Sequence, residues 1–502
     1  MKNKVVSTSS EWTIDLLKKY EKELTKLAEE YQLSTYRTQI DIISAEQMMD
    51  AHASVGMPLS YNHWSFGKQF VNIEKSYKRG HMGLAYEIVI NSNPCIVSLL
   101  EENTLAMQVL VLAHAAIGHN SFFKNNYLFQ AWTSADSIID YLVFAQKYIA
   151  TCEERYGIDA VEELLDAAHA LMNYGVDRYR RSPRLSLQEE KLRQSEREEY
   201  QQSQVNSIWR TLPKSKKNST NHDKNFPEDP EENILYFIEK NAPLLEPWQR
   251  EVIRIVRKIA QYFYPQRQTK VMNEGWATFW HYTLLNDLFK NKLVNESFMV
   301  EFIHNHTNVI FQPGFDNPHY YGLNPYTLGF SIFQDLRRIA ENPTEEDKHW
   351  FPDFANTNWV KTLDFAMRNF KDESFIAQFL SPKVIRDLKL FSILDNDEVG
   401  ELEISAIHND AGYQHIRETL ARQYDLSNID PNIQVYNVNR RQDRSLTLRY
   451  TESYHRTLGQ DTEEVVRHLY RLWGFPVKLE KVAEDGTITL LFSCPSSAPP
   501  AQ

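Results

Sequence analysis

Apolar residues recur at helical spacing over most of the chain. Residues 11–31 place apolar side chains on one helical face, and Lys and Glu occupy the opposite face. Residues 101–117 have the length and apolar composition of a buried helix, with Gly118 near its end. The same spacing predicts further helices over 134–156, 159–173 (with Asp159 as its N-cap), 247–263, 275–289, 298–310, 328–340 and 357–370. These segments predict a large, mainly helical N-terminal body.

One short apolar run inside this body fits two structures. Residues 84–90 form either a short strand or a buried helical turn, because the run is too short for periodicity to decide. Asn91, Asn93 and Pro94 then end the element.

The pattern changes near residue 382 from helical spacing to alternation of apolar and polar residues, which is typical of strands. Two amphipathic helices, 414–425 and 462–474, interrupt this alternation. The order of elements is therefore β-β-α-β-β-α-β-β, and the predicted fold class is α+β. The predicted strands are 391–397, 401–408, 432–438, 445–451, 475–482 and 487–493.

A polar segment divides the helical body into two parts. Residues 182–233 are rich in Gln, Ser, Glu, Lys and Asn and have few apolar residues, which indicates a flexible, solvated insertion. The predicted domains are the first part of the body, this insertion, the second part of the body and the small α+β module: 1–181, 182–233, 234–382 and 383–496.

Composition and charge narrow the function classes. The chain has 502 residues, is 42% hydrophobic and carries a net charge of −12, which argues against a general nucleic-acid or anionic-membrane binder. Its three cysteines are far apart and form no C-x-x-C pair, so neither a disulfide framework nor a thiolate zinc site is expected. The apolar stretch 105–117 is too short to span a bilayer, and the N-terminus lacks an apolar signal region. We therefore expect a cytoplasmic protein without a transmembrane segment.

Ionisable side chains are concentrated among aromatic residues in one window, 61–133. It contains His63, His81, Glu87, His114 and His119. A buried charge costs several kcal/mol unless it is paired or bound, so these residues are the first candidates for a functional site.

His114 and His119 are separated by five residues in the segment LAHAAIGHN. On a regular α-helix this spacing points the two rings about 140° apart. The zinc-protease pattern H-E-x-x-H has a spacing of four and a Glu after the first His, so this segment departs from it twice. Two arrangements remain: Gly118 breaks the helix and His119 turns back towards His114, or the two histidines serve different hydrogen-bond networks. In the simplest alternative, both are hydrogen-bonded core histidines.

A second segment, NEGWATFWHY at 273–282, supplies Glu274, His281 and Tyr282. Glu274 and His281 share a helical face but lie about 10 Å apart along the axis, which is too far for one ion. Its N-E-G-x-A start is similar to the third-ligand segment of several H-E-x-x-H metallopeptidases. Together with His114 and His119, Glu274 would give the three protein ligands that a catalytic zinc commonly uses. Alternatively, Glu274 is a carboxylate at a helix N-terminus, stabilised by the helix dipole.

The missing glutamate of the zinc-protease pattern needs a substitute. Glu87 can act as the general base if the fold brings it near, since catalytic carboxylates need not lie on the metal-binding helix. In this hypothesis His281 or Tyr282 orients the substrate. A third cluster, in residues 304–330, contains His304, His306 and His319 and is punctuated by Pro and Gly, which is typical of a rigid loop.

The sequence lacks the motifs of several other classes of enzyme and binding protein. The chain has no G-x-S-x-G for a serine hydrolase and no G-x-x-x-x-G-K-[ST] for a phosphate-binding loop. Rossmann, EF-hand and C-x-x-C zinc patterns are also absent from the sequence.

Long blocks of the sequence resemble the SpoVR family, named after stage V sporulation protein R. The resemblance covers nearly the whole chain, and its most specific blocks are YNHWSFGKQF, GLAYEIVINSNPCI, AHAAIGHNSFFKNNYLF, SIIDYLVFAQKYI, HALMNYGVDRYRR, NEGWATFWHY and NPYTLGF. The resemblance implies a link to formation of the spore cortex or, in bacteria that do not sporulate, to stress physiology. It also implies an AAA+-type serine kinase and a von Willebrand-like domain protein as partners. It implies no reaction and no catalytic residues.

Two hypotheses of different classes follow. The first is a metal-dependent hydrolase with metallopeptidase-like features, in which His114, His119 and Glu274 hold a divalent ion such as zinc and Glu87 handles protons. The second is a non-enzymatic regulator or scaffold, whose C-terminal α+β module docks on the kinase.

Overall fold

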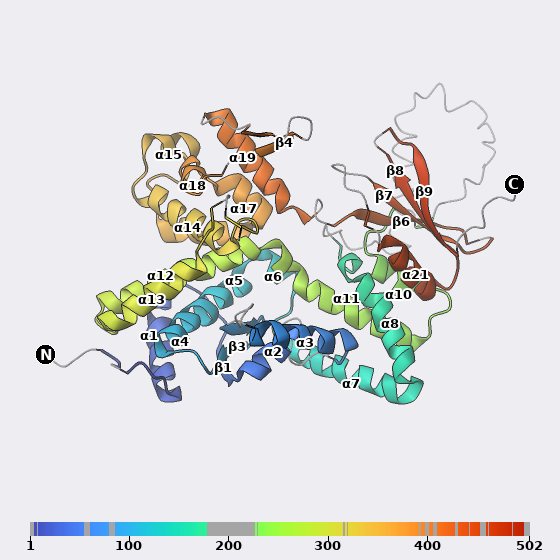
Figure 1. Cartoon of the computed structure of the whole chain (residues 1–502), viewed down its shortest axis with the longest axis horizontal. Helices are drawn as coiled ribbons and strands as arrows, with labels where there is room; N and C mark the ends of the chain where they lie inside the picture. The colour runs from blue at the N-terminus through green and yellow to red at the C-terminus, as the bar shows by residue number, and fades with distance from the viewer. Residues whose placement is uncertain are drawn as a thin grey trace, which may run out of the picture. The chain divides into compact units, whose positions relative to one another are not determined.

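The computed structural model confirms the α+β class, with a mainly helical body and a small C-terminal sheet module (Figure 1). The chain divides into two compact units, Met1–Glu162 with Gln261–Asp430, and Glu163–Ala260 with Pro431–Gln502. Most of the predicted insertion 182–233 lies outside the described residues. The structure describes residues 5–7, 9–54, 61–79, 86–177, 226–227, 229–314, 317–318, 320–390, 393–396, 401–404, 409–426, 430–440, 442–451, 458–459, 461–483 and 485–495.

Helices form most of the first unit, and the helical periodicity of the sequence located most of the long ones but missed α3 (Trp64–Lys78). The prediction that Asp159 is an N-cap is wrong, because Asp159 lies inside the first turn of α8 (Ile158–Ala170). Helix α8 and α11 (Pro247–Gln268) each span the two units. The other helices of the first unit are α1 (Ile14–Glu30), α2 (Ala45–Ala53), α3 (Trp64–Lys78), α4 (Leu105–Val111), η1 (Leu112–His119), α5 (Asn120–Asn125), α6 (Tyr127–Trp132), α7 (Ile138–Tyr156), α12 (Lys270–Lys290), α13 (Glu296–Val309), α14 (Pro325–Glu341), α15 (Glu345–Trp350), α16 (Trp359–Asn369), α17 (Asp372–Phe379), α18 (Pro382–Asp387) and α19 (Asp410–Gln423).

A three-stranded sheet lies beside these helices in the order β1-β3-β2. Strand β1 (Thr38–Ile43) runs parallel to β3 (Cys95–Leu100), and β2 (Glu87–Ile90) runs antiparallel to β3. The ambiguous run at 84–90 thus contains a strand. Strands β1 and β3 were not predicted from the sequence, because neither shows a clear alternation of apolar and polar residues.

Helix α12 is the centre of the first unit and crosses two neighbours at very close range. A Cβ placed on Gly118 of η1 would lie 2.5 Å from the Cα of Ala277. A Cβ on Gly275 would lie 2.4 Å from the backbone of Gly329 in α14. Glycine is needed at both crossings, because any side chain would push the backbones apart. These contacts fix α12 on both sides of Glu274.

The continuous helical segment Leu105–Asn125, made of α4, η1 and α5, is long and apolar enough to cross a membrane by length and composition. Its most apolar window is entirely buried inside the protein, which is the position of a core helix. The sequence pattern had ended this helix near Gly118, but the helix continues to Asn125.

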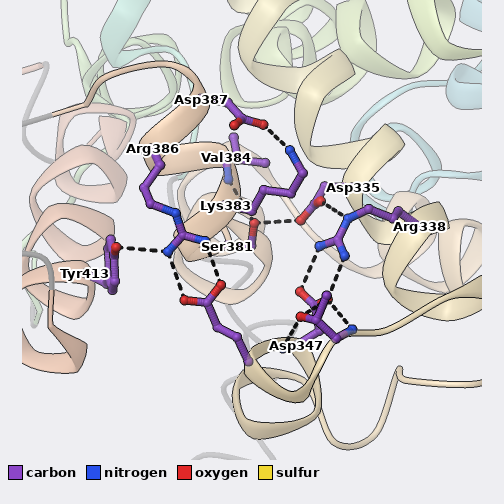
Figure 2. Close-up of polar contacts among 11 residues, drawn as sticks. Asp335, Arg338, Asp347, Ser381, Lys383, Val384, Arg386, Asp387 and Tyr413 are labelled. Atoms are coloured by element: carbon purple, nitrogen blue, oxygen red, sulfur yellow. Dashed lines mark hydrogen bonds and ion pairs between the residues drawn. The ribbon is translucent and has the colours of Figure 1, made fainter.

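A network of ion pairs holds the later helices of the first unit together (Figure 2). Arg338 of α14 donates to both carboxylate oxygens of Asp347 at 2.6 and 2.7 Å and to Asp335 at 2.7 Å. Arg386 of α18 donates to Tyr413 of α19 at 2.9 Å and pairs with Glu346 of α15 at 2.6 Å. Helix α19 also contributes apolar side chains to the core of the first unit. Its packing therefore lies with the helical body.

The second unit contains a four-stranded sheet in the order β6-β7-β8-β9. Helix α21 (Thr462–Trp473) connects the parallel strands β7 and β8, and it contacts β8 and β9, whereas α10 (Ile234–Asn241) contacts β6 (Figure 1). The hairpin β4 (Ile393–Asn396) and β5 (Glu401–Ile404) precedes α19, so the predicted order β-β-α-β-β-α-β-β is confirmed. The predicted domain bounds stay a prediction. The strands of the sheet are β6 (Asn432–Val438), β7 (Leu446–Thr451), β8 (Val477–Val482) and β9 (Ile488–Cys494).

Candidate metal site

Four side chains singled out in the sequence meet inside the first unit. Nε2 of His114 and Nε2 of His119 lie 3.6 and 3.5 Å from the same atom, Oε2 of Glu274. Nε2 of His114 also lies 3.9 Å from Oε1 of Glu87. Glu87, His114 and His119 each offer one ligand atom within 4.8 Å of the others. The fold thus brings together β2, η1 and α12, although α12 follows η1 by more than 150 positions in the chain.

The two imidazoles meet because η1 is a π-helix. Its hydrogen bonds run from residue i to i+5, so its turns are wider than those of an α-helix, and residues five apart lie on one side. The ring centroids of His114 and His119 are 4.6 Å apart, with the rings at 88° to each other. The expectation that a break at Gly118 would bring the rings together is wrong, because the helix continues into α5. The alternative of different hydrogen-bond networks holds for the Nδ1 atoms, which contact His281 and Asn273, whereas both Nε2 atoms face Glu274.

Glu274 lies in the second turn of α12 and is not the group that caps the helix. That role belongs to Asp372, whose carboxylate accepts hydrogen bonds from the backbone nitrogens of Val271 and Met272, both at 2.8 Å. Oε2 of Glu274 is buried and has no hydrogen-bond partner. Buried polar atoms are almost always satisfied, so this oxygen, which faces two imidazole nitrogens, is an exception among the described residues.

The other ring nitrogens of the two histidines are engaged by neighbours. His119 donates from Nδ1 to Oδ1 of Asn273 at 2.9 Å. Nδ1 of His114 lies 3.0 Å from Nδ1 of His281, and Nε2 of His281 lies 2.8 Å from Nδ1 of His306. Both Nε2 atoms are thereby directed towards Glu274. A partner on the second ring nitrogen fixes the orientation of an imidazole.

Burial controls the charge of the imidazoles. It lowers the pKa of His119 to about 4 and that of His306 to about 4, and it holds the pKa of His281 well below its usual range. These three rings are therefore neutral at pH 7, and a metal ligand must be neutral. Burial also lowers the pKa of His114, but the carboxylates of Glu274 and Glu87 outweigh it and leave that pKa raised.

The two carboxylates of this site, Glu87 and Glu274, have pKa values that are shifted in opposite directions. Burial raises the pKa of Glu87 above its usual value. Burial acts on Glu274 in the same direction, but the nearby imidazoles of His119 and His114 outweigh it and lower its pKa. Two carboxyl groups with pKa values pushed apart are the usual arrangement of an acid–base site. Glu274 is the better anion, and Glu87 is the better carrier of a proton.

A cavity of about 620 Å³ opens beside these groups. Its size is in the range of small-molecule and cofactor sites. Besides Glu87, His114, His119 and Glu274, it is lined by polar side chains that include His52, Tyr86, Gln266, Lys270, Asn273 and Tyr326. The hydroxyl of Tyr326 interacts with the carboxylate of Glu274.

The remaining predicted residues lie at different depths. His281 is fully buried, contacts His114 and is also one of the residues that line the cavity. Tyr282 is not part of the cavity lining, and its ring packs against His306 and Phe330. His63 caps the N-terminus of α3, and His81 lies outside the described residues.

Sequence reasoning missed three groups of the site: Asn273, Tyr326 and Lys270. Asn273 directly precedes Glu274, and Tyr326 lies in the NPYTLGF block, so the resemblance held a signal for both. Lys270 carries no motif. His306 had been assigned to a rigid loop, but it lies on α13 and joins the site through His281.

Fold and site together define a mainly helical α+β protein with a buried histidine–carboxylate cluster beside a cavity. A family model described as "SpoVR like protein" matches residues 11–429, and one described as "SpoVR-like C-terminal domain" matches residues 431–484. The chain is 62% identical over 491 residues to the "Uncharacterized protein YcgB" of Escherichia coli (strain K12), with 98% of this chain and 96% of that protein covered. The chain belongs to the SpoVR family. No solved structure matches it.

Proposed function

We propose that this SpoVR-family protein is a metal-dependent hydrolase, with a divalent ion held by His114, His119 and Glu274. The observation that carries the proposal is the convergence of two Nε2 atoms on the unpartnered oxygen of Glu274, at 3.6 and 3.5 Å. Ligand atoms about 2.0–2.2 Å from a tetrahedral ion lie roughly 3.3–3.6 Å from one another. These two separations match that spacing and are too long for good hydrogen bonds.

Zinc is the ion whose usual donors fit this set best, since it takes imidazole nitrogen and carboxylate oxygen. When bound, such an ion polarises a substrate oxygen and lowers the pKa of a coordinated water. Glu87 is the proposed proton carrier, because its raised pKa makes it a stronger base than an ordinary carboxylate. Tyr326 contacts Glu274 from α14 and holds that carboxylate in place. The cavity supplies the space for a substrate.

Metal content of the untagged protein tests the ligand set. We expect about one zinc or other transition ion per wild-type chain, and its loss in His119→Ala and Glu274→Gln. Glu87→Gln should keep the ion, because Glu87 is assigned to proton transfer. His304→Ala is the matched control, since His304 is an exposed histidine on α13. A wild-type protein that takes up no ion from supplied zinc, manganese or iron would contradict the proposal.

Hydrolysis tests the chemistry. The zinc-loaded protein is incubated with a mixture of short peptides and acylated amines, and new products are followed by mass spectrometry. Glu87→Gln should reduce the rate by about 10²–10⁴-fold, which is the usual contribution of a general base. Equal product formation by wild type and Glu87→Gln would remove Glu87 from the mechanism.

We also propose the cellular setting that family membership supports: spore-cortex, cell-envelope or stress physiology in the cytoplasm. The proposed partners are an AAA+-type serine kinase and a von Willebrand-like domain protein. Affinity capture of the full-length chain from its own bacterium, followed by mass spectrometry, should recover both. Recovery of neither from stationary-phase cells would argue against this setting.

A further inference from the structure

Three buried imidazoles form a row behind the candidate metal site. His114 contacts His281 through their Nδ1 atoms at 3.0 Å, and His281 contacts Nδ1 of His306 through its Nε2 atom at 2.8 Å. The exposed fractions are 3%, 0% and 4%, so water does not compete for these nitrogens. The three rings come from η1, α12 and α13. The row therefore connects η1, α12 and α13 to one candidate metal ligand, His114.

Hydrogen-bond chemistry fixes the direction of the row. A neutral imidazole has one N–H donor and one acceptor nitrogen. If Nε2 of His114 supplies its lone pair to an ion, the proton of His114 must be on Nδ1, and it is donated to Nδ1 of His281. His281 then carries its proton on Nε2 and donates it to Nδ1 of His306. Each nitrogen between the rings is thus satisfied, with no additional charge in the core.

The surroundings of His306 complete the arrangement. Its ring lies between aromatic neighbours, with centroids 4.9 Å from Tyr282, 5.1 Å from Phe330 and 5.8 Å from Phe302. These contacts hold the last acceptor of the row in place.

We infer that His281 and His306 are positioning residues, which set the tautomer and ring orientation of His114 so that its Nε2 atom faces the ion. This inference rests on the proposed function. It also replaces the prediction that His281 orients a substrate, because both nitrogens of that fully buried ring are engaged by other histidines. In most proteins a carboxylate or a backbone carbonyl performs this task, and here a neutral histidine pair does.

Substitutions that keep or remove one acceptor test the inference. In His281→Asn the amide oxygen can replace Nδ1 as the acceptor for His114, whereas His281→Leu has a similar volume and no acceptor. His306→Asn and His306→Leu form the same pair one step further out. Zinc affinity is measured for each by competition with a chromogenic chelator. We expect about a 10–100-fold loss for His281→Leu, a smaller loss for His306→Leu, and recovery in both Asn variants.

A second measurement reads the tautomer directly and needs no metal. Long-range ¹H–¹⁵N spectra of ¹⁵N-histidine-labelled, metal-free protein at alkaline pH should show His114 with its proton on Nδ1, assigned by comparison with His114→Gln. A proton on Nε2 would overturn the inference, as would equal affinity losses in the Leu and Asn variants. If wild type binds no metal but His114 has the Nδ1 tautomer, the row stands as a structural feature and the proposed function fails.

Discussion

Glu87 and Glu274 show how one buried environment gives two carboxylates opposite protonation behaviour. Both are removed from water, which alone would raise both pKa values. Glu274 lies between two imidazoles and its pKa falls, whereas Glu87 lies 3.9 Å from His114, and burial together with the charge of Glu274 raises its pKa. One residue position therefore suits holding a cation, and the other suits exchanging protons.

Asp347 lets the same reasoning be tested on stability. Burial raises its pKa, but Arg338 and Thr344 outweigh it through hydrogen bonds and lower the pKa from 3.8 to about 2. A carboxylate whose pKa is lower in the folded state stabilises the protein above its unfolded pKa, and this stabilisation is lost as pH falls through the folded value. A shift of this size corresponds to about 2 kcal/mol.

We therefore expect the difference in unfolding free energy between wild type and Asp347→Asn to shrink by about 2 kcal/mol between pH 6 and pH 2. Urea unfolding at several pH values measures it. Asp364→Asn is the control, because Asp364 forms an exposed pair with Arg368, and such pairs contribute only about 0–1 kcal/mol. A difference for Asp347→Asn that is the same at both ends of this range would show that the pair does not stabilise the fold through its charge.

At the scale of elements, the candidate site depends on how closely α12 approaches its neighbours. The contact of Gly275 with Gly329 involves backbone atoms on both sides, so an added methyl group cannot be accommodated by rotating a side chain. Gly275 directly follows Glu274, and a change in the α12–α14 separation would move that carboxylate relative to η1. Helix packing and ligand geometry are thus coupled through adjacent residues.

Gly275→Ala should lower the unfolding free energy by about 1–3 kcal/mol, the usual cost of overpacking, and should reduce metal occupancy. Gly67→Ala is the matched control, because Gly67 lies on α3 and a methyl group added there would meet no other atom within 4 Å. That change should stabilise by about 0.5–1 kcal/mol, since alanine is the better helix former. Thermal or urea unfolding together with elemental analysis distinguishes the two; equal effects of both changes would mean that the close crossing is not what holds α12.

At the scale of the whole molecule, the sequence predicted the elements whose periodicity is sustained and missed those whose structure depends on neighbours. Long amphipathic helices such as α1 and α11, and the strands of the C-terminal sheet, were located from their patterns. Strand β1 was not, because the burial of TQIDII does not alternate between the faces of its sheet. Whether such a segment forms a strand depends on its packing against other segments, and the periodicity of the segment alone does not reveal that packing.

The candidate site also has a part that the sequence predicted and a part that only the structure reveals. His114, His119, Glu274 and Glu87 could be selected from residue type and local pattern alone. Their meeting required the π-helical turn of η1, which depends on a register of backbone hydrogen bonds that leaves no trace in the apolar pattern. Asn273 and Tyr326 take part through tertiary contacts. Residue chemistry therefore selected the candidate ligands, and the structure added the residues that contact them.

The widened turn of η1 has a consequence for recognising similar proteins. A chain with one extra residue between two histidines can keep both on one side of a helix through a local π-helical turn, as His114 and His119 show. Sequence searches that require a spacing of four between such histidines will miss this arrangement. Histidine pairs that are five residues apart in a long buried helix are therefore worth inspecting wherever a Glu or Asp from another segment can reach them.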